Sequence, residues 1–314
     1  MPGYLIIIIS ILSLLALLII LYLIYMKHVF NNNFLRDKEI PLTEVDLSKT
    51  HYAPYVDKIA KNMKKALNLP YEEISITSND NLKLIGRYYN NNSKKTVIFV
   101  HGFKALPYNN FATQLLSFLE HGYNALVIWN RAHGISDGKY ITFGVKESDD
   151  LHLWIDKVND LYHPESIILY GTSMGGATVL ITEGEKNHEN VKVVIDDCGF
   201  KSINSVIIPK LKRNHIPPVI VIPVFKLYCR IFAKYKLLEK EPINYVGKIL
   251  KPIIFIHSEL DDTVYISDSI DMAKLAQKET LNIFVKNAGH TSTFLANEDE
   301  VAPKIFEFLD KYTK

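Results

Sequence analysis

The most reactive setting in the chain surrounds Ser173, which stands in Gly-Thr-Ser-Met-Gly at residues 171–175. A strand-like apolar run precedes this motif, and a helical pattern follows it. Gly-x-Ser-x-Gly between a strand and a helix lifts the serine above the edge of a sheet on a sharp turn. A helix that begins there also directs free backbone N–H groups at developing negative charge. The pattern predicts a nucleophilic serine suited to acyl transfer.

A serine hydroxyl is a weak nucleophile, so it needs a base within hydrogen-bond reach that is itself held by a carboxylate. On a strand–turn–helix of this kind, the acid and then the base follow the serine along the chain. The histidines after Ser173 are His188, His215, His257 and His290. His188 lies at a charged helix end, His215 lies in a long insertion, and His257 precedes the acid it would need. His290, in the loop after the last strand-like run, is the predicted base.

The acid is expected directly after the strand that precedes this loop. Residues 253–257 form that strand, and three carboxylates follow it: Glu259, Asp261 and Asp262. Spacing from the strand end favours Asp261. Two alternatives follow an earlier strand-like run and remain open: Asp196 and Asp197.

Short apolar runs alternate with helical patterns through most of the chain. The strand-like runs lie at residues 73–77, 82–89, 96–100, 124–129, 166–170, 191–195, 253–257 and 281–285. The helical patterns lie at residues 53–67, 108–121, 145–158, 175–183, 267–277 and 299–312. Polar residues 79–81 separate the first two strands and indicate a hairpin. Apolar strands alternating with helices predict an α/β fold, with a mostly parallel sheet covered by helices on both faces.

One segment, about residues 200–245, breaks this alternation. It is rich in Pro, basic and large apolar residues and predicts a cap over the carboxyl edge of the sheet, where open α/β sheets bind ligands. From Phe200 to Lys240 it holds nine basic residues and one acid. A surface both basic and apolar suits contact with anionic lipid headgroups. The alternative is an ordinary lid that packs its apolar face over the site while its lysines face water.

The first 26 residues contain an uncharged stretch of mainly Ile and Leu, from Tyr4 to Met26. As a helix it would span about 34 Å, enough for a bilayer core of about 30 Å. No basic residue precedes it and it exceeds a typical signal-peptide core, which favours a retained anchor over a cleaved signal. We therefore expect a transmembrane anchor at 1–26, a polar tether at 27–50 and an α/β domain at 51–314. The basic residues after the stretch favour a cytoplasmic domain, and they are Lys27, Arg36 and Lys38.

Composition excludes several classes of protein. A net charge of +2 gives no indication of a nucleic-acid partner. The two cysteines, Cys198 and Cys229, form neither a disulfide framework nor a zinc-ligand pattern. The glycines around Ser173 lack the Lys-Ser/Thr of a nucleotide-binding loop. We expect no metal and no cofactor.

Several motifs occur in a characteristic order along the chain. They are His-Gly-Phe at 101–103, Asn-Arg-Ala-His-Gly-Ile-Ser at 130–136, the serine motif, Asp196-Asp197, the Asp261 turn and Gly289-His290. Together they resemble the α/β-hydrolases, specifically a bacterial branch of membrane-anchored esterases related to prolyl-oligopeptidase-like hydrolases. The resemblance extends from about residue 72 to the C-terminus. Ser258 stands where that family often has Gly, and Asn130 where it often has Asp.

The resemblance implies an oxyanion hole made by the backbone N–H groups of Phe103 and Met174. It implies a serine hydrolase that cleaves carboxylic esters of short to medium acyl length through an acyl-enzyme. The substrate would be a small ester or a lipid-like molecule. A peptidase or amidase of the same fold and a non-catalytic binding module are the alternatives. His101 and His133 lie in tight turns, where we expect a structural role.

Overall fold

A computed structural model describes residues 2–37, 47–48 and 50–313 of the chain. Within them, eight strands form one sheet in the order β1-β2-β4-β3-β5-β6-β7-β8. Strands β1 and β2 form an antiparallel hairpin, β2 is antiparallel to β4, and all other neighbours are parallel. The strands are β1 (Glu72–Thr77), β2 (Lys83–Tyr89), β3 (Lys95–Val100), β4 (Asn124–Ile128), β5 (Ser166–Thr172), β6 (Val191–Asp197), β7 (Ile253–Ser258) and β8 (Thr280–Val285). The predicted sheet and hairpin are confirmed.

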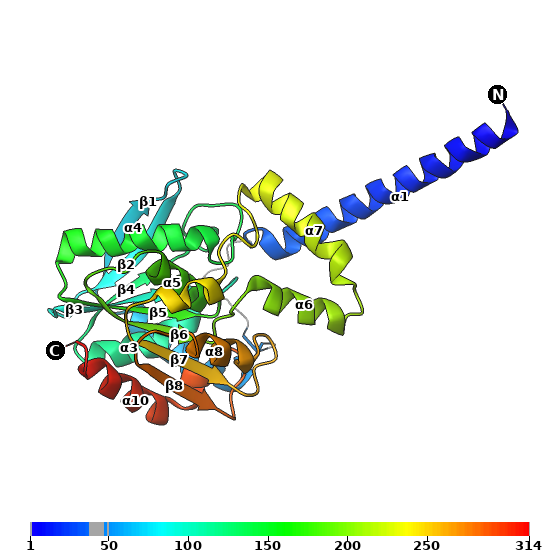
Figure 1. The fold of residues 1–314 in the computed structure, drawn as a ribbon. Helices are drawn as coiled ribbons and strands as arrows, with labels where there is room; N and C mark the ends of the chain where they lie inside the picture. The colour runs from blue at the N-terminus through cyan, green and yellow to red at the C-terminus, as the bar shows by residue number, and fades with distance from the viewer. Residues whose placement is uncertain (1, 38–46, 49, 314) are drawn as a thin grey trace.

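Helices cover both faces of this sheet (Figure 1). The principal helices are α1 (Gly3–Phe34), α2 (Val56–Leu67), α3 (Pro107–Glu120), α4 (Val145–Tyr162), α5 (Met174–Glu185), α6 (Ile203–Arg213), α7 (Pro218–Tyr228), α8 (Ile266–Ala273) and α10 (Glu298–Asp310). Shorter helical turns are η2 (Ala53–Tyr55), η3 (Cys229–Ala233), η4 (Pro242–Asn244), η5 (Val246–Lys248) and α9 (Thr293–Ala296).

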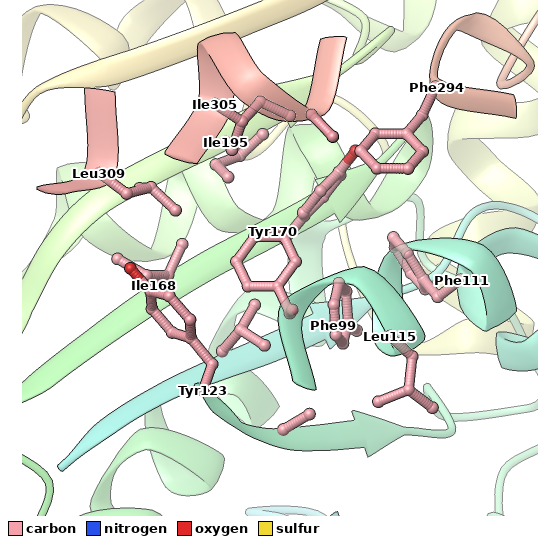
Figure 2. Close-up of a cluster of buried hydrophobic side chains, with 14 of the residues drawn as sticks. Phe99, Phe111, Leu115, Tyr123, Ile168, Tyr170, Ile195, Phe294, Ile305 and Leu309 are labelled. Carbon is pink, nitrogen blue, oxygen red and sulfur yellow. The ribbon is translucent and has the colours of Figure 1, made fainter. Parts of the chain in front are cut away.

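The two faces of the sheet bury separate apolar cores because successive strand residues point to opposite sides. On β3, Phe99 faces α2, α3 and α10, whereas Ile98 faces α4, α5 and α8. Figure 2 shows the first core, where Phe99 and Tyr170 meet Phe111 of α3 and Ile305 of α10. Both cores hold strands β3 and β5 rigidly. The loops at their carboxyl ends therefore start from fixed positions.

The N-terminal helix runs further than the sequence predicts. The expected tether began at residue 27, but α1 is helical to Phe34. Residues 4–21 are exposed, whereas Met26, Phe30 and Phe34 are buried against the domain. The prediction of a tether at 27–34 is wrong, because aromatic residues one turn apart give this polar-looking stretch an apolar face. The rest of the expected tether falls largely on residues 38–46 and 49, including Lys38, outside the described residues.

The segment after β6 forms two helices, α6 and α7, followed by η3. The hydroxyl of Ser202, at the N-cap of α6, accepts a hydrogen bond from Asn204 N, and Pro218 begins α7 at a position that needs no N–H partner. In Figure 1, α6 and α7 lie beyond the sheet on the side where α1 leaves the domain. This is the segment in which the sequence predicts a cap.

Candidate active site

Ser173 connects β5 to α5 in a strained backbone conformation, with φ 55° and ψ −114°. Strain of this kind persists only where the surroundings enforce it, and it clusters at active sites. The surroundings here are backbone: a Cβ on Gly175 would lie 1.8 Å from Val100 O, and one on Gly171 2.1 Å from Gly175 O. Both positions must therefore be glycine. The Ser173 N–H donates to Asp197 O at 2.8 Å and fixes the turn further.

His290 lies in the loop between β8 and α9, at the same edge of the sheet as Ser173. Its Nε2 is 2.8 Å from Ser173 Oγ, and its Nδ1 is 2.6 Å from Asp261 Oδ2. An ionised Asp261 only accepts hydrogen bonds, so Nδ1 carries the proton and Nε2 is left to accept one from the serine. The structure thus brings together the three predicted residues, 117 and 29 positions apart along the chain.

Asp261 sits in the turn after β7 with its side chain buried. Its Oδ1 accepts hydrogen bonds from the backbone N–H groups of Thr263 and Val264, both at 2.9 Å. Burial alone would raise the pKa of this carboxyl, but hydrogen bonds from His257 and His290 and their charges hold it well below its usual range. Asp261 is therefore ionised at neutral pH and can orient His290.

His257 contacts the acid Asp261, and the sequence did not reveal this role of His257. Its Nε2 is 3.2 Å from Asp261 Oδ2 and 2.9 Å from Val264 O, and its Nδ1 is 2.7 Å from Ser269 Oγ. Burial opposes charge on the ring, yet the bond to Asp261 and its charge raise the pKa of His257. The signal in the sequence was its spacing, because His257 precedes Asp261 by four residues across the turn.

The alternative acids point elsewhere. Asp196 Oδ1 accepts a hydrogen bond from Gly199 N at 2.9 Å, and Asp197 Oδ2 accepts one from the Tyr170 hydroxyl at 3.1 Å. Burial raises the pKa of Asp196 to about 7 and that of Asp197 to about 6. Glu259 and Asp262 are exposed. Among these carboxylates, Asp261 is the one within hydrogen-bond distance of His290.

The segment after β3 passes close to the serine. A Cβ on Gly102 would lie 3.3 Å from Ser173 Cβ, and Gly102 N donates to Asn110 Oδ1 at 2.9 Å. Phe103 follows Gly102, and its ring stacks on Phe143 with centroids 5.0 Å apart. Met174 begins α5, so its N–H precedes the first hydrogen bond within the helix. Both predicted oxyanion-hole segments therefore border Ser173.

His101 and His133 brace this segment. His101 Nε2 accepts a hydrogen bond from Asn130 N at 3.0 Å, and His133 Nε2 accepts one from Lys104 N at 3.0 Å. The two rings meet edge to face, 4.7 Å apart. Both side chains are buried and committed to backbone groups. Their contacts agree with the expected structural role.

Tyr52 is a second residue that the sequence did not reveal. Its buried hydroxyl accepts a hydrogen bond from Asn110 Nδ2 and lies 2.5 Å from the Thr291 hydroxyl. Asn110 in turn holds Gly102, and Thr291 follows His290. The segment before α2 therefore couples the loop beside the serine to the loop of the base.

One cluster in the described part of the chain has metal-ligand character. Ligand atoms of Cys198, Asp261 and His290 all lie within 4.8 Å of one another. Burial first, and the nearby carboxylates next, raise the pKa of the Cys198 thiol well above its usual value, which disfavours the thiolate that metals bind. A metal there would also replace the hydrogen bond between Asp261 and His290. The geometry favours the hydrogen-bonded arrangement.

Comparison with known proteins fits this arrangement. The model of the serine aminopeptidase S33 family matches residues 91–214. The solved structure of the Pyrococcus furiosus esterase Pf2001 superposes with a TM-score of 0.65 at 26% identity, over 80% of this chain and 94% of the esterase. The chain belongs to the α/β-hydrolase superfamily and is a hydrolase by class.

Among curated proteins, the uncharacterized Bacillus subtilis protein YqkD is 28% identical over 217 residues, which cover 68% of this chain and 71% of YqkD. The structure of an acylaminoacyl peptidase superposes with a TM-score of 0.56 at 18% identity, over 78% of this chain and 42% of the peptidase. At that identity it shows the shared fold alone.

Proposed function

We propose that this chain is a membrane-anchored serine esterase that cleaves carboxylic esters of short to medium acyl length. Ser173 is the nucleophile, His290 the general base and Asp261 the acid that orients it. The observation that carries the proposal is the continuous hydrogen-bonded line from Ser173 Oγ through His290 to Asp261, at 2.8 and 2.6 Å. The likeness to the Pyrococcus furiosus esterase supports the choice of esters.

The reaction proceeds in two steps. His290 Nε2 takes the serine proton as Oγ attacks the ester carbonyl, and the backbone N–H groups of Phe103 and Met174 stabilise the oxyanion. The same imidazolium then protonates the departing alcohol, which leaves an acyl-enzyme. Water attacks this intermediate with His290 again acting as base, releases the acid and restores Ser173.

The side chains packed around Met174, next to the serine, are apolar and support an acyl substrate. Met174 and Phe103 belong to a cluster with Phe143, Phe200 and Val264. Side chains of this size and polarity suit a hydrocarbon chain and offer little to a charged peptide. The substrate proposed is therefore a small ester or a lipid-like ester.

An aminopeptidase or amidase is the second candidate, favoured by the S33 family match at residues 91–214. Both candidates use the same nucleophile, so the leaving group must be varied. Hydrolysis of p-nitrophenyl acyl esters should exceed that of matched aminoacyl p-nitroanilides. The reverse preference would make the chain a peptidase.

The nucleophile is tested with a fluorophosphonate probe. Ser173→Ala should lose both labelling and ester hydrolysis while its thermal unfolding stays cooperative. Ser117→Ala, in helix α3 outside the site, is the matched control and should keep both. Absence of labelling in the folded wild-type protein would favour a non-catalytic binding module.

Helix α1 is the proposed anchor. Its apolar stretch is long enough to cross a membrane, and residues 4–21 of it are exposed. Because the same helix continues into the domain core at Phe30 and Phe34, retention is favoured over cleavage. Mass spectrometry of the membrane-extracted protein should find residues 1–26 present. A soluble product that starts after Met26 would identify a signal peptide.

The proposed orientation places the domain in the cytoplasm, because basic residues follow the span. In the folded protein, Lys27 Nζ lies 3.0 Å from the centre of the Phe232 ring, and Arg36 donates to Ser136 O at 2.7 Å. Orientation is set during insertion, before these contacts form. Protease protection in sealed inverted vesicles distinguishes the two faces, since a cytoplasmic domain would be digested.

A further inference from the structure

Helix α7 meets α1 at the depth where a membrane span would end. From Gly3 to Tyr22 the helix rises about 30 Å, at roughly 1.5 Å per residue, which matches the thickness of a bilayer core. The Tyr228 hydroxyl donates to Leu23 O at 2.8 Å, and the Tyr22 hydroxyl donates to Ile220 O. Figure 1 shows α7 crossing α1 at this point instead of running parallel to it. A helix that crosses the end of a span can lie along the bilayer surface.

Aromatic side chains fix this crossing. The Phe30 ring lies 5.6 Å from that of Tyr228 and 6.2 Å from that of Phe225, both edge to face. Lys27 Nζ, one turn earlier on α1, lies over the Phe232 ring of η3. These contacts are buried or half-buried and link two segments about 200 residues apart. The position of α7 relative to the span is therefore set by packing.

The outer face of α7 and η3 is apolar and uncovered. The inner face buries Val221, Phe225 and Tyr228, at helical spacing. The outer face exposes Val219 (76%), Ile220 (48%), Leu227 (48%) and Ile231 (47%). Exposed apolar residues of this kind on a short helix, with basic residues among them, are the pattern of helices that lie in the membrane interface.

Basic residues lie among these exposed apolar residues. Lys226 and Arg230, one turn apart, line a hollow of about 180 Å³ together with Lys236, and Glu239 is its one acidic lining residue. Elsewhere in the cap, Lys201 pairs with Asp268 and Asp271, and Lys240 with Asp149 and Glu185. At the hollow, Lys236 pairs with Glu239 at 3.9 Å, whereas no acid in the described part of the chain pairs with Lys226 or Arg230. Positive charge among exposed apolar residues suits the anionic headgroups of a lipid surface.

We propose that α7 and η3 form an interfacial membrane helix, whose exposed face sits in the headgroup region of an anionic bilayer. The inference rests on the proposed span of α1, and it adds a second point of membrane contact on the cap. Residue 22 marks the membrane boundary on α1, and Val219 and Ile220 lie at the same level. The α7–η3 segment of the expected cap therefore stands directly on the lipid surface.

The test measures the depth of single labelled positions in the full-length protein. Both native cysteines are buried, so an environment-sensitive fluorophore can be attached at one introduced cysteine. The variants are Val219→Cys on α7, Ile11→Cys in the span and Leu161→Cys on α4, an exposed apolar position away from the cap. Each is reconstituted in phosphatidylcholine bilayers with or without phosphatidylglycerol. Quenchers are placed at the lipid headgroup or deep in the acyl chains.

The label at position 219 should be quenched by the headgroup quencher, that at 11 by the deep quencher, and that at 161 by neither. Quenching at 11 together with a label at 219 that behaves like 161 would overturn the interfacial helix and leave the span intact. Lack of quenching at 11 would overturn the span itself, and with it the basis of this inference.

A charge-reversal pair tests the headgroup contact. In Lys226→Glu with Arg230→Glu, headgroup quenching at position 219 in the anionic bilayer should fall about twofold or more. Lys304→Glu with Lys311→Glu, at the far end of the domain near α10 in Figure 1, is the matched control and should leave it unchanged. Equal quenching in both double variants would show that charge has no part in the contact.

Discussion

Replacing Asp261 by Asn tests the proposed site most directly, because the two side chains have the same shape. The amide can keep its oxygen toward the N–H groups of Thr263 and Val264, which Asp261 Oδ1 now satisfies at 2.9 Å. Its NH₂ group then replaces Oδ2, 2.6 Å from His290 Nδ1. Facing a donor, Nδ1 must become an acceptor, and the proton moves to Nε2. The base then presents a hydrogen to the serine instead of a lone pair.

The expected loss in kcat/KM is about 10⁴-fold, the usual effect of a wrong histidine tautomer in such a triad. This corresponds to about 5 kcal/mol of transition-state stabilisation. The opposite orientation of the amide is less favourable, because it would place the NH₂ group against the backbone N–H groups of Thr263 and Val264. A smaller structural cost is expected as well, about 1–3 kcal/mol, because the amide also meets the Nε2–H of His257 at 3.2 Å.

The assay is hydrolysis of a p-nitrophenyl ester, with thermal unfolding of each variant measured in parallel. Asp197→Asn and Asp196→Asn are matched controls and should stay within about tenfold of the wild type, because neither carboxylate contacts His290. A folded Asp261→Asn protein with nearly normal turnover would refute the assignment. A collapse in Asp197→Asn alone would transfer the role of acid to the earlier strand.

Three further outcomes are expected. Phe30→Ala should lower the free energy of unfolding by about 3–5 kcal/mol, measured by denaturant titration in detergent, because the ring is fully buried; no change would mean that α1 does not pack on the domain. Tyr52→Phe should cost about 1–3 kcal/mol by the same measurement, because Asn110 and Thr291 lose a shared partner. The raised pKa of His257 stabilises the folded protein fully below its ordinary pKa of about 6.5, and this contribution is lost as pH rises through the raised value. Thermal midpoints recorded from about pH 6 to about pH 9 should therefore fall less steeply in His257→Gln than in the wild type.

The sequence predicted the parts of the site that depend on local backbone geometry. The glycines around Ser173 are needed because any Cβ would meet backbone within about 2 Å, so the motif is readable without a structure. Asp261 and His290 could be predicted because the loops that follow parallel strands lie at one edge of the sheet. The order of strands and helices could also be predicted, because apolar periodicity is a local property of the sequence.

The parts that were missed depend on contacts between distant segments. Tyr52 and Thr291 are 239 residues apart, and nothing local marks either one. The polar stretch after Lys27 suggested a loop. In the structure, Asn33 Nδ2 donates to Val29 O at 2.8 Å within the helix, while Phe30 and Phe34 stack 4.5 Å apart and turn toward the cap. Composition hid this apolar face because the asparagines outnumber the aromatic residues.

The continuous helix from Gly3 to Phe34 has a mechanical consequence. A span longer than the local hydrocarbon layer tilts to match it, and a thinner bilayer increases the tilt. Because Phe30 and Phe34 are packed into the domain, a tilt of α1 turns the whole domain with it. If α1 is the span proposed above, bilayer thickness sets the angle at which the catalytic edge faces the lipid. The acyl-chain length of the surrounding lipids would then alter the activity of the proposed esterase without any lipid binding to the domain.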